Sequence, residues 1–441
     1  MKILFTFWCV LFLYTPQKFA DITLAITGCN VITMNSEGVL KNQTILISQD
    51  KIVAILPADQ WGNKQDIETI DGRGRYVIPA LTDMHIHVNK YSDWMFPLLL
   101  LYGVTTIRVM GGSEAVLNWR DSVNNDLKLA PEIHCASQVI DGQPPFWGDL
   151  HEGPILTEVD SVAQVINAQL TKGYEFIKAY NRLDKDVYAE IRKVCFNNNI
   201  KLTGHIPTSV NKEDIFTGET GEIEHLSGYA RYASNIDSVS KEALAKNSDM
   251  THDHELAQNV SLAKMKSAAE KTRRFNIWNC PTLIVHGIKT DSIFCRQLLN
   301  TKLAGKLAPV SGWWKSQGYK IKPGDDKLWQ FKKAMTKQLH QQKAFLLAGT
   351  DSPVPWVVPG LSMHQELAFL VEAGLSNYYA LKTATVNPSI WFGNLYNKGT
   401  IEKGKAADLI ILSANPLENI RNTQKIVQVI YKGKLFRRAI K

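Results

Sequence analysis

The stretch LTDMHIHV at residues 81–88 is an apolar run, typical of a buried β-strand, that ends with His85 and His87. Side chains alternate along a strand, so both imidazoles project on the same face of its carboxyl end. This spacing suits the ligation of one metal ion. The same spacing recurs at His252 and His254, but inside a polar segment, where we expect solvated side chains. Position at a strand end therefore makes the first pair the candidate metal site.

Beyond this run, apolar β-rich segments alternate with longer helix-patterned stretches. Eight strands separated by helices predict an α/β fold, specifically a (β/α)8 TIM barrel. Active sites of such barrels gather at the carboxyl ends of the strands, so the chemistry is expected there. The eight runs are Leu81 to Val88, Val104 to Val109, Glu132 to Val139, Phe176 to Tyr180, Lys201 to Ile206, Glu222 to Leu226, Ile277 to Val285 and Phe345 to Asp351.

Both ends of the chain consist instead of short β-rich runs split by turn signals. Runs such as TILIS and KIVAIL occur before residue 78, and ADLIIL at 407–412 is followed by a hairpin that turns at Lys432-Gly433-Lys434. We expect the two ends to join in a small β-sandwich domain. The predicted division is residues 21–78 for its first part, 79–394 for the barrel and 395–441 for its second part.

The first twenty residues are predicted to be a signal peptide. Lys2 precedes an apolar run from Ile3 to Tyr14, which is too short to span a bilayer but has the length of a signal-peptide core. Ala20 suits the last position before a cut, whereas Lys18 is poor where a small residue is expected. Export, to a periplasm or outside the cell, is the favoured interpretation, and a retained membrane anchor is the alternative. After removal of the signal no stable membrane insertion is expected.

The composition indicates a globular chain with a large core. Of 441 residues, 45% are hydrophobic and 21% charged, which excludes wholesale disorder. The net charge of +8 is scattered, so no nucleic-acid partner is expected. The six cysteines show no C-x-x-C spacing, and we expect buried thiols instead of disulfides or a cysteine zinc site. A small-molecule substrate is the expected partner, and a homo-oligomer is left open.

Four more chemically capable residues follow apolar runs, each at a different strand end. They are Lys178 in FIKAY, His205 in LTGHIP, His225 in IEHL and Asp351 in LLAGTDSP. Singly, each has a structural explanation, such as a snorkelling lysine, a core histidine or a helix N-cap. Together with the first pair they bring four histidines, a lysine and an aspartate from five strands to one barrel mouth. Mixed nitrogen and oxygen ligation suits zinc, or manganese or iron.

Lys178 has a specific role in such a site. An ammonium cannot ligate a cation, but a lysine whose proton affinity is lowered by metal charge can add carbon dioxide. The carbamate that results is an anionic oxygen bridge. We therefore expect two divalent metal ions and a carboxylated Lys178, a centre that generates hydroxide near neutral pH and polarises a carbonyl.

In combination these segments resemble the metal-dependent amidohydrolase superfamily, in its imidazolonepropionase-like and prolidase-like branch, over nearly the whole chain after the signal. The segments include VIPALTDMHIHV, GVTTIRVMGG, FIKAYNRL, LTGHIP, IEHLSGY, LLAGTDSPVPW and KGTIEKGKAADLIILSANPLENI. The resemblance implies that His85 and His87 bind the more buried metal and that carboxylated Lys178 bridges both metals. It also implies that His205 and His225 hold the second metal and that Asp351 ligates and shuttles the proton.

Three departures from the family pattern bear on this transfer. Many relatives carry an aspartate where this chain has Val109, a change that we expect to alter packing and not ligation. The dipeptidase branch often has a Gly-Gly-His element after the third run, where this chain has DGQPPFW at 141–147. Relatives that use one metal often place a glutamate three residues after the strand-five histidine, where this chain has Thr208.

The sequence therefore predicts an exported amidohydrolase that cleaves C–N bonds of small amides such as N-acyl amino acids or dipeptides. Metal-bridged hydroxide would be the nucleophile and Asp351 the proton shuttle, with His286 as the competing shuttle. The alternatives are a mononuclear deaminase or cyclic-amidine hydrolase, and a non-catalytic barrel that only binds a ligand. Tyr229 and Arg231, which follow His225, are candidate substrate contacts.

Overall fold

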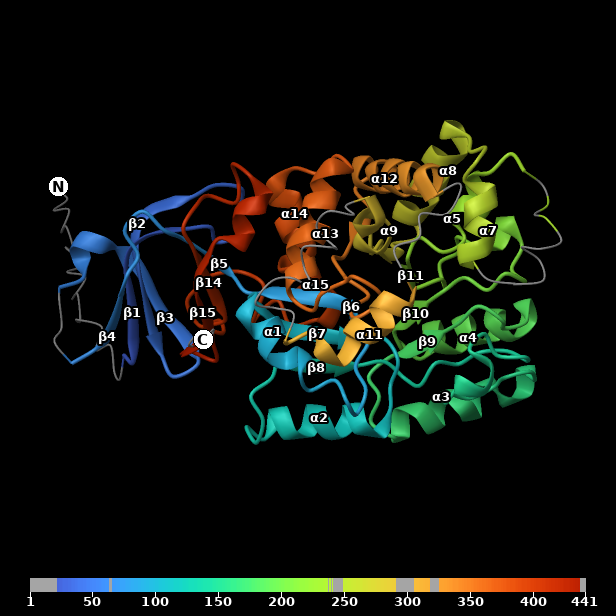
Figure 1. The fold of residues 1–441 in the computed structure, drawn as a ribbon, viewed down its shortest axis with the longest axis horizontal. Coiled ribbons are helices and arrows are strands. Elements are labelled where there is room, and N and C mark those ends of the chain that lie inside the picture. The colour runs from blue at the N-terminus through green and yellow to red at the C-terminus, as the bar shows by residue number, and fades with distance from the viewer. Residues whose placement is uncertain are drawn as a thin grey trace, which may run out of the picture.

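The computed structural model describes residues 22–62, 66–236, 238, 240, 249–290, 305–317 and 325–436. The predicted signal peptide, residues 1–20, lies outside these ranges, as do Cys9 and Cys295. Figure 1 shows a β-sheet beside a larger part in which helices surround strands. We call this larger part, from β6 to α15, the α/β part. Across the described ranges, no helix combines the length and the apolar character needed to cross a membrane.

Both chain ends contribute to one eight-stranded sheet, with the order β16-β15-β14-β5-β1-β2-β3 and with β4 paired to β1. The ends meet where β14 runs antiparallel to β5 and places Leu409 opposite Pro79. Strand β1 pairs with β4 along its first half and with β5 along its second, so the sheet branches there. These pairings give one branched sheet, and the predicted two-layer sandwich is not confirmed. The strands are β1 (Leu24–Val31), β2 (Leu40–Ser48), β3 (Lys51–Pro57), β4 (Glu68–Asp71), β5 (Tyr76–Pro79), β14 (Leu409–Leu412), β15 (Ile426–Tyr431) and β16 (Lys434–Phe436).

Each of the eight apolar runs contains a strand of the α/β part. The ladders are parallel and form three sheets, β6-β7-β8, β9-β10 and β11-β12-β13. The mixed α/β class is thereby confirmed. The strands are β6 (Leu81–Ile86), β7 (Val104–Val109), β8 (Glu132–Cys135), β9 (Ile177–Ala179), β10 (Leu202–Gly204), β11 (Glu222–Glu224), β12 (Trp278–Cys280) and β13 (Phe345–Leu346).

Backbone hydrogen bonds connect these three sheets at two of the three gaps between them. Ser137 N donates to Phe176 O (2.7 Å) between the first and second sheets, and Met84 N donates to Ala348 O (2.9 Å) between the last and the first. Among the described residues no ladder joins β10 to β11. Complete closure into a barrel therefore stays a prediction.

The seventh predicted run is too long. It was expected to reach Val285, but β12 ends at Cys280 and helix α9 (Ile284–Gly287) begins soon after. Pro281 has no N–H with which to continue a ladder, and Thr282 adopts a left-handed φ of +47°. The chain therefore turns into a helix and carries His286 with it.

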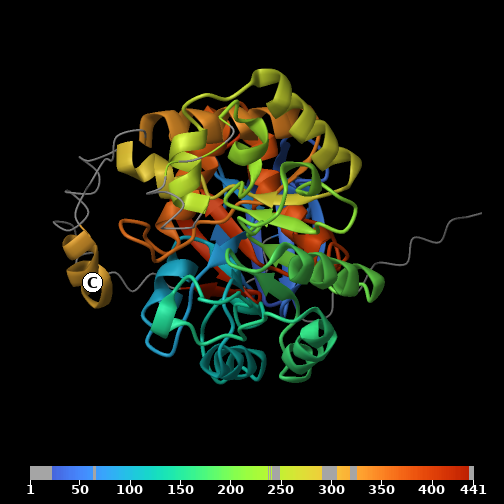
Figure 2. The ribbon, with the colours of Figure 1, turned by 90° about the vertical axis from the view of Figure 1, so that its right-hand side faces the viewer.

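Helices follow the strands and lie around them, as the end-on view in Figure 2 shows. Ser113, Asp184 and Ser261 cap α2, α4 and α8 by accepting a hydrogen bond from a first-turn amide. Besides α9, the described helices are α1 (Met95–Leu101), α2 (Glu114–Asn124), α3 (Val162–Thr171), α4 (Lys185–Asn197), α5 (Tyr229–Ala233), α7 (Asp249–Leu256), α8 (Leu262–Arg274), α11 (Ala308–Gln317), α12 (Asp325–Gln341), α13 (Leu361–Glu372), α14 (Asn377–Thr383) and α15 (Val386–Phe392).

The apolar core is divided between the two parts. Residues such as Ile26, Ile45 and Leu409 form a cluster within the sheet, whereas a larger cluster fills the α/β part and also includes Ile78 and Ile410 of the sheet. The predicted domain limits after residues 78 and 394 stay predictions. The four described cysteines, Cys29, Cys135, Cys195 and Cys280, are buried free thiols, as expected.

A partly buried charge network joins strand β8 to the C-terminal segment. Lys398 Nζ contacts the carboxylate of Glu132 and lies 2.9 Å from Asp408 Oδ2. His134 places Nδ1 2.6 Å from Glu175 Oε2 and Nε2 3.4 Å from Glu132 Oε1. Burial lowers the pKa of His134, but these two carboxylates raise it by more. The resulting pKa is about 9. The imidazole is therefore charged at neutral pH.

We expect the stability of the protein to fall as the pH rises through about 9. The pKa of His134 rises from 6.5 to about 9 on folding, so its contribution is complete below pH 6.5 and is lost above the folded value. At about 1.36 kcal/mol per pH unit this contribution is at most about 3 kcal/mol. Thermal unfolding of the wild type and of His134→Gln, each at about pH 6 and pH 9.5, checks this. Between the two pH values, the melting temperature of the wild type should fall by more than that of the variant. Equal falls in melting temperature would contradict the assignment.

Candidate metal centre

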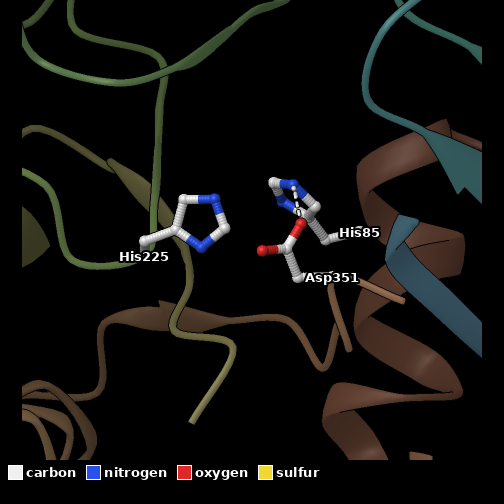
Figure 3. Close-up of side chains that lie close together, drawn as sticks. All are labelled: His85, His225 and Asp351. Carbon is white, nitrogen blue, oxygen red and sulfur yellow. Dashed lines mark ion pairs between the residues drawn. The ribbon is translucent and has the colours of Figure 1, made fainter. Parts of the chain in front are cut away.

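Side chains from three strand ends meet at the carboxyl end of the α/β strands. His85 belongs to β6, His225 follows β11 and Asp351 follows β13, and their ligand atoms all lie within 4.8 Å of one another. The rings of His85 and His225 have centroids 4.4 Å apart. Figure 3 shows the Asp351 carboxylate beside both imidazoles, with Oδ1 3.3 Å from His85 Nε2.

The other three predicted ligands lie around this group. His87 Nε2 is 2.9 Å from Asp351 Oδ1, and 46% of the His87 side chain is exposed. The ring of His205, just after β10, lies 5.0 Å from that of His225. Lys178 is buried within β9, and its charge interacts with that of Asp351. The structure thus brings all six predicted ligands to one place, while their roles as ligands stay a prediction.

Three of the four histidines have their Nδ1 atom held by a hydrogen bond. The partner is Glu224 Oε2 for His85 (2.6 Å), Asn181 Oδ1 for His205 (2.9 Å) and Thr282 Oγ1 for His225 (2.7 Å). Each partner atom can accept a hydrogen bond, and the Thr282 hydroxyl already donates its own hydrogen to Pro281 O. We therefore assign the Nδ1–H tautomer to all three rings, which leaves Nε2 as a free lone pair. This is the arrangement of metal-ligating histidines.

The electrostatics of the site fit divalent cations. Burial lowers the pKa of His205 and of His225 well below the usual value, so both imidazoles are neutral. His85 Nε2 is buried and lies 3.3 Å from Asp351 Oδ1. Burial lowers the pKa of His85, but the charge of Glu224, together with hydrogen bonds to the carboxylates beside the ring, raises it by more, so that the net shift is upward. Burial also lowers the pKa of Lys178, which favours the uncharged amine. Imidazoles and a carboxylate are donors that divalent metals use, and a lysine whose pKa is lowered is the kind that can add carbon dioxide.

The backbone at two of these ligands is held in the left-handed region. His225 has φ +56° and Asp351 has φ +62°, conformations that cost about 1 kcal/mol or more for residues with a Cβ. Asp351 N donates to His85 O (2.7 Å), and Lys332 Nζ donates to His225 O. Lys332 is itself buried on α12, 3.7 Å from Asp253 of α7. Surrounding structure therefore fixes both ligands.

A second brace ties β6 to the end of β13. Asp83 Oδ1 accepts from Thr350 N (2.9 Å), and Asp83 Oδ2 accepts from the Thr350 hydroxyl (2.6 Å). Gly349 allows this approach, because a Cβ there would lie 2.5 Å from Cys280 Sγ and 2.7 Å from His85 Cβ. The two strands that carry His85 and Asp351 are therefore locked together.

Sequence reasoning missed the charge network beneath the ligands. Arg108 in β7 is fully buried and makes hydrogen bonds of 2.6 and 2.7 Å to the two Glu222 oxygens. It also donates to Glu224 Oε1 (2.8 Å), which accepts from Thr203 Oγ1 (2.6 Å) as well. The other Glu224 oxygen holds His85. The sequence feature that could have indicated this network is an arginine inside the apolar run 104–109, together with two glutamates on the same face of the run 222–226.

The two predicted substrate contacts lie elsewhere. Tyr229 is completely buried in α5, and its hydroxyl is hydrogen bonded to Thr272 (2.7 Å) and Asn279 (2.8 Å), which favours a packing role. Arg231 donates to the backbone carbonyls of residues 207 and 208, so it braces the loop after β10. A substrate role for either residue is not supported by these contacts.

Other histidines also differ from expectation. His252 is buried, and His254 Nε2 lies 2.6 Å from Asp325 Oδ1, so the prediction that both are solvated is wrong. The cause is α12, which packs over α7 and supplies Asp325. His286 Nδ1 is buried, and within the described ranges it has no hydrogen-bond partner.

Comparisons with known proteins agree with this geometry. The family model described as "Amidohydrolase family" matches residues 76–436. Among solved structures, a Xaa-Pro dipeptidase is similar with a TM-score of 0.68 and 17% identity, covering 94% of this chain and 99% of that one. The bottromycin amidohydrolase has a TM-score of 0.70 and 20% identity, with 93% and 86% covered. Ochratoxinase from A. niger has a TM-score of 0.62 and 18% identity, with 95% and 96% covered.

The curated relatives match over short stretches only. Imidazolonepropionase from Thermoplasma acidophilum is 37% identical over 65 residues, which is 14% of this chain and 16% of that protein. The 5-methylthioadenosine/S-adenosylhomocysteine deaminase from Clostridium tetani is 29% identical over 99 residues, covering 22% and 20%. The chain therefore spans a fifth or less of the length of these relatives in the matched stretches.

We expect Arg108→Met to destabilise the protein strongly. The change leaves two buried carboxylates side by side without their cation, a type of loss that costs about 3–5 kcal/mol. Arg73→Met is the control, because Arg73 forms an ion pair with Asp71 at the surface and is 82% exposed. Denaturant unfolding of both variants measures the difference. Equal transition midpoints would show that the buried network contributes little.

Proposed function

Since the chain belongs to the amidohydrolase family, we propose that it hydrolyses the C–N bond of a small amide, such as an N-acyl amino acid or a dipeptide, at a binuclear metal centre. Family membership supports a hydrolase that acts on C–N bonds and uses divalent metal ions. The observation that carries the proposal is the set of three histidines whose Nδ1 atoms are held by hydrogen bonds, which leaves Nε2 as the candidate metal-binding atom of each ring. We also propose that the eight parallel strands close into a (β/α)8 barrel around this centre.

His85 and His87 would hold one ion, and His205 and His225 the other. Carboxylated Lys178 would lie between them, supported by its complete burial and by the lowered pKa of its amine. Two bound divalent ions, most simply zinc, would lower the pKa of water and polarise the substrate carbonyl. The glutamate behind His85, the amide behind His205 and the hydroxyl behind His225 keep the ligand rings oriented.

Asp351 would carry the proton. Hydrolysis of an amide requires that the attacking water lose a proton and that the leaving amine gain one. Burial raises the pKa of Asp351, but contacts with His85 and His87 bring it well below the usual value, so the carboxylate is ionised. Its left-handed backbone and its bond to His85 O fix its position between the histidines.

The substrate class is supported by two of the structural neighbours, a Xaa-Pro dipeptidase and the bottromycin amidohydrolase. A one-metal deaminase is less well supported, because Thr208 stands where such relatives place a glutamate and its hydroxyl lies 3.5 Å from Asn181 O. A non-catalytic barrel would have no need for all six ligands. We further propose that the protein is exported, on the strength of the apolar segment between Ile3 and Tyr14.

We expect Asp351→Asn to lower kcat by about two to four decades, the range of general acid–base catalysis. The amide keeps an oxygen toward the metal but cannot relay a proton, so metal content should fall only modestly. Steady-state kinetics with N-acyl amino acids and metal analysis of the same samples test this.

His286→Asn is the matched control, since this imidazole lies in α9, the helix that follows the neighbouring strand β12. It should retain most of the activity. Near-native kcat in Asp351→Asn, with activity lost in His286→Asn while the metals stay bound, would move the shuttle to the segment after β12.

A further inference from the structure

A line of aromatic rings runs from the candidate metal centre to the protein surface. The ring of Tyr180 packs against that of His205 with centroids 4.4 Å apart, and the ring of Phe146 lies 5.7 Å from that of Tyr180. Trp147 continues the line, 5.1 Å from Phe146. Exposure rises along it, from 9% for Tyr180 to 53% for Trp147. We call Tyr180, Phe146 and Trp147 the aromatic wall.

The loop after β8, which carries Phe146 and Trp147, is held in one conformation by a buried carboxylate. Asp141 is completely buried and accepts hydrogen bonds from the backbone N–H of Gly142 (2.9 Å), Phe146 (2.8 Å) and Arg182 (2.7 Å). The last of these follows β9, so the loop is tied to the strand that carries Lys178. A wall that is already formed loses little conformational entropy when a ligand binds.

The same loop exposes more apolar surface than a loop needs. Leu150 is 82% exposed and Ile155 46%, in addition to Trp147. Exposed apolar side chains that gather on one loop are a feature of binding surfaces. The ring contacts connect this surface to His205, which favours a ligand that enters the metal centre over a macromolecule that docks outside it.

We propose that the aromatic wall selects substrates that carry an aromatic or large apolar group beside the scissile amide. This inference rests on the proposed function and narrows its substrate class. Phe146 and Trp147 meet edge to face at 84°, so a substrate ring laid against them gains both offset and edge contacts. A methyl group is too short to reach beyond Tyr180 to these rings.

Kinetics with three matched amides test the selection: N-benzoylalanine, N-acetylphenylalanine and N-acetylalanine. The wild type should prefer at least one aromatic amide over N-acetylalanine by about tenfold in kcat/KM, a range typical of side-chain discrimination in an apolar pocket. Trp147→Ala and Phe146→Leu should remove most of this preference through KM while leaving N-acetylalanine unchanged within about twofold. Tyr396→Ala is the control, because Tyr396 is 82% exposed and lies outside the wall, and it should keep the preference.

A binding measurement separates this inference from the proposed function. Calorimetric titration with phenylacetate and with acetate should give a Kd for phenylacetate about tenfold lower in the wild type and in Tyr396→Ala, with the difference lost in Trp147→Ala. Selective binding of phenylacetate without hydrolysis of any of the three amides would contradict the proposed function. It would still support the aromatic wall as a binding site for aromatic groups. If the amides are hydrolysed with no preference for the aromatic ones, and Trp147→Ala does not change kcat/KM, the proposed selection by the aromatic wall is contradicted.

Discussion

The guanidinium of Arg108, neutralised inside the α/β part by two glutamates, is the interaction on which the candidate centre depends. Glu224 shares one carboxylate between this cation, the Thr203 hydroxyl and His85. A buried charge without partners would be prohibitive, so the strands that carry these residues must align for the fold to form at all. That alignment also sets the tautomer of His85. The same contacts that make the interior stable therefore prepare the site for a metal.

Two of the proposed ligands are held in strained backbone conformations by hydrogen bonds from their neighbours. His225 and Asp351 both have positive φ, and each is fixed through its own backbone, by Lys332 in one case and by His85 in the other. Packed neighbours must overcome the cost of such conformations, which is why they concentrate at functional sites. This gives the long segment between β12 and β13 a structural task, because α12 supplies Lys332.

Local sequence patterns predicted the strands, and they predicted which side chains meet at the strand ends. Strands of a parallel sheet are buried on both faces, so they appear as continuous apolar runs, and a histidine or aspartate that ends such a run is conspicuous. The Arg108 network was not predictable in the same way, because its partners are more than a hundred residues apart. Tyr229 was misplaced because a left-handed Gly228, with φ +80°, starts a short helix that turns the side chain into the core. The burial of His252 depended on α12, which no local pattern connects to α7.

The most direct test of the binuclear centre is a zinc titration of metal-free protein, carried out with and without bicarbonate. Carboxylated Lys178 predicts close to two ions bound per chain when bicarbonate is present and loss of the second when carbon dioxide is excluded. One ion per chain under both conditions would contradict a bridging carbamate and would favour chemistry at a single metal.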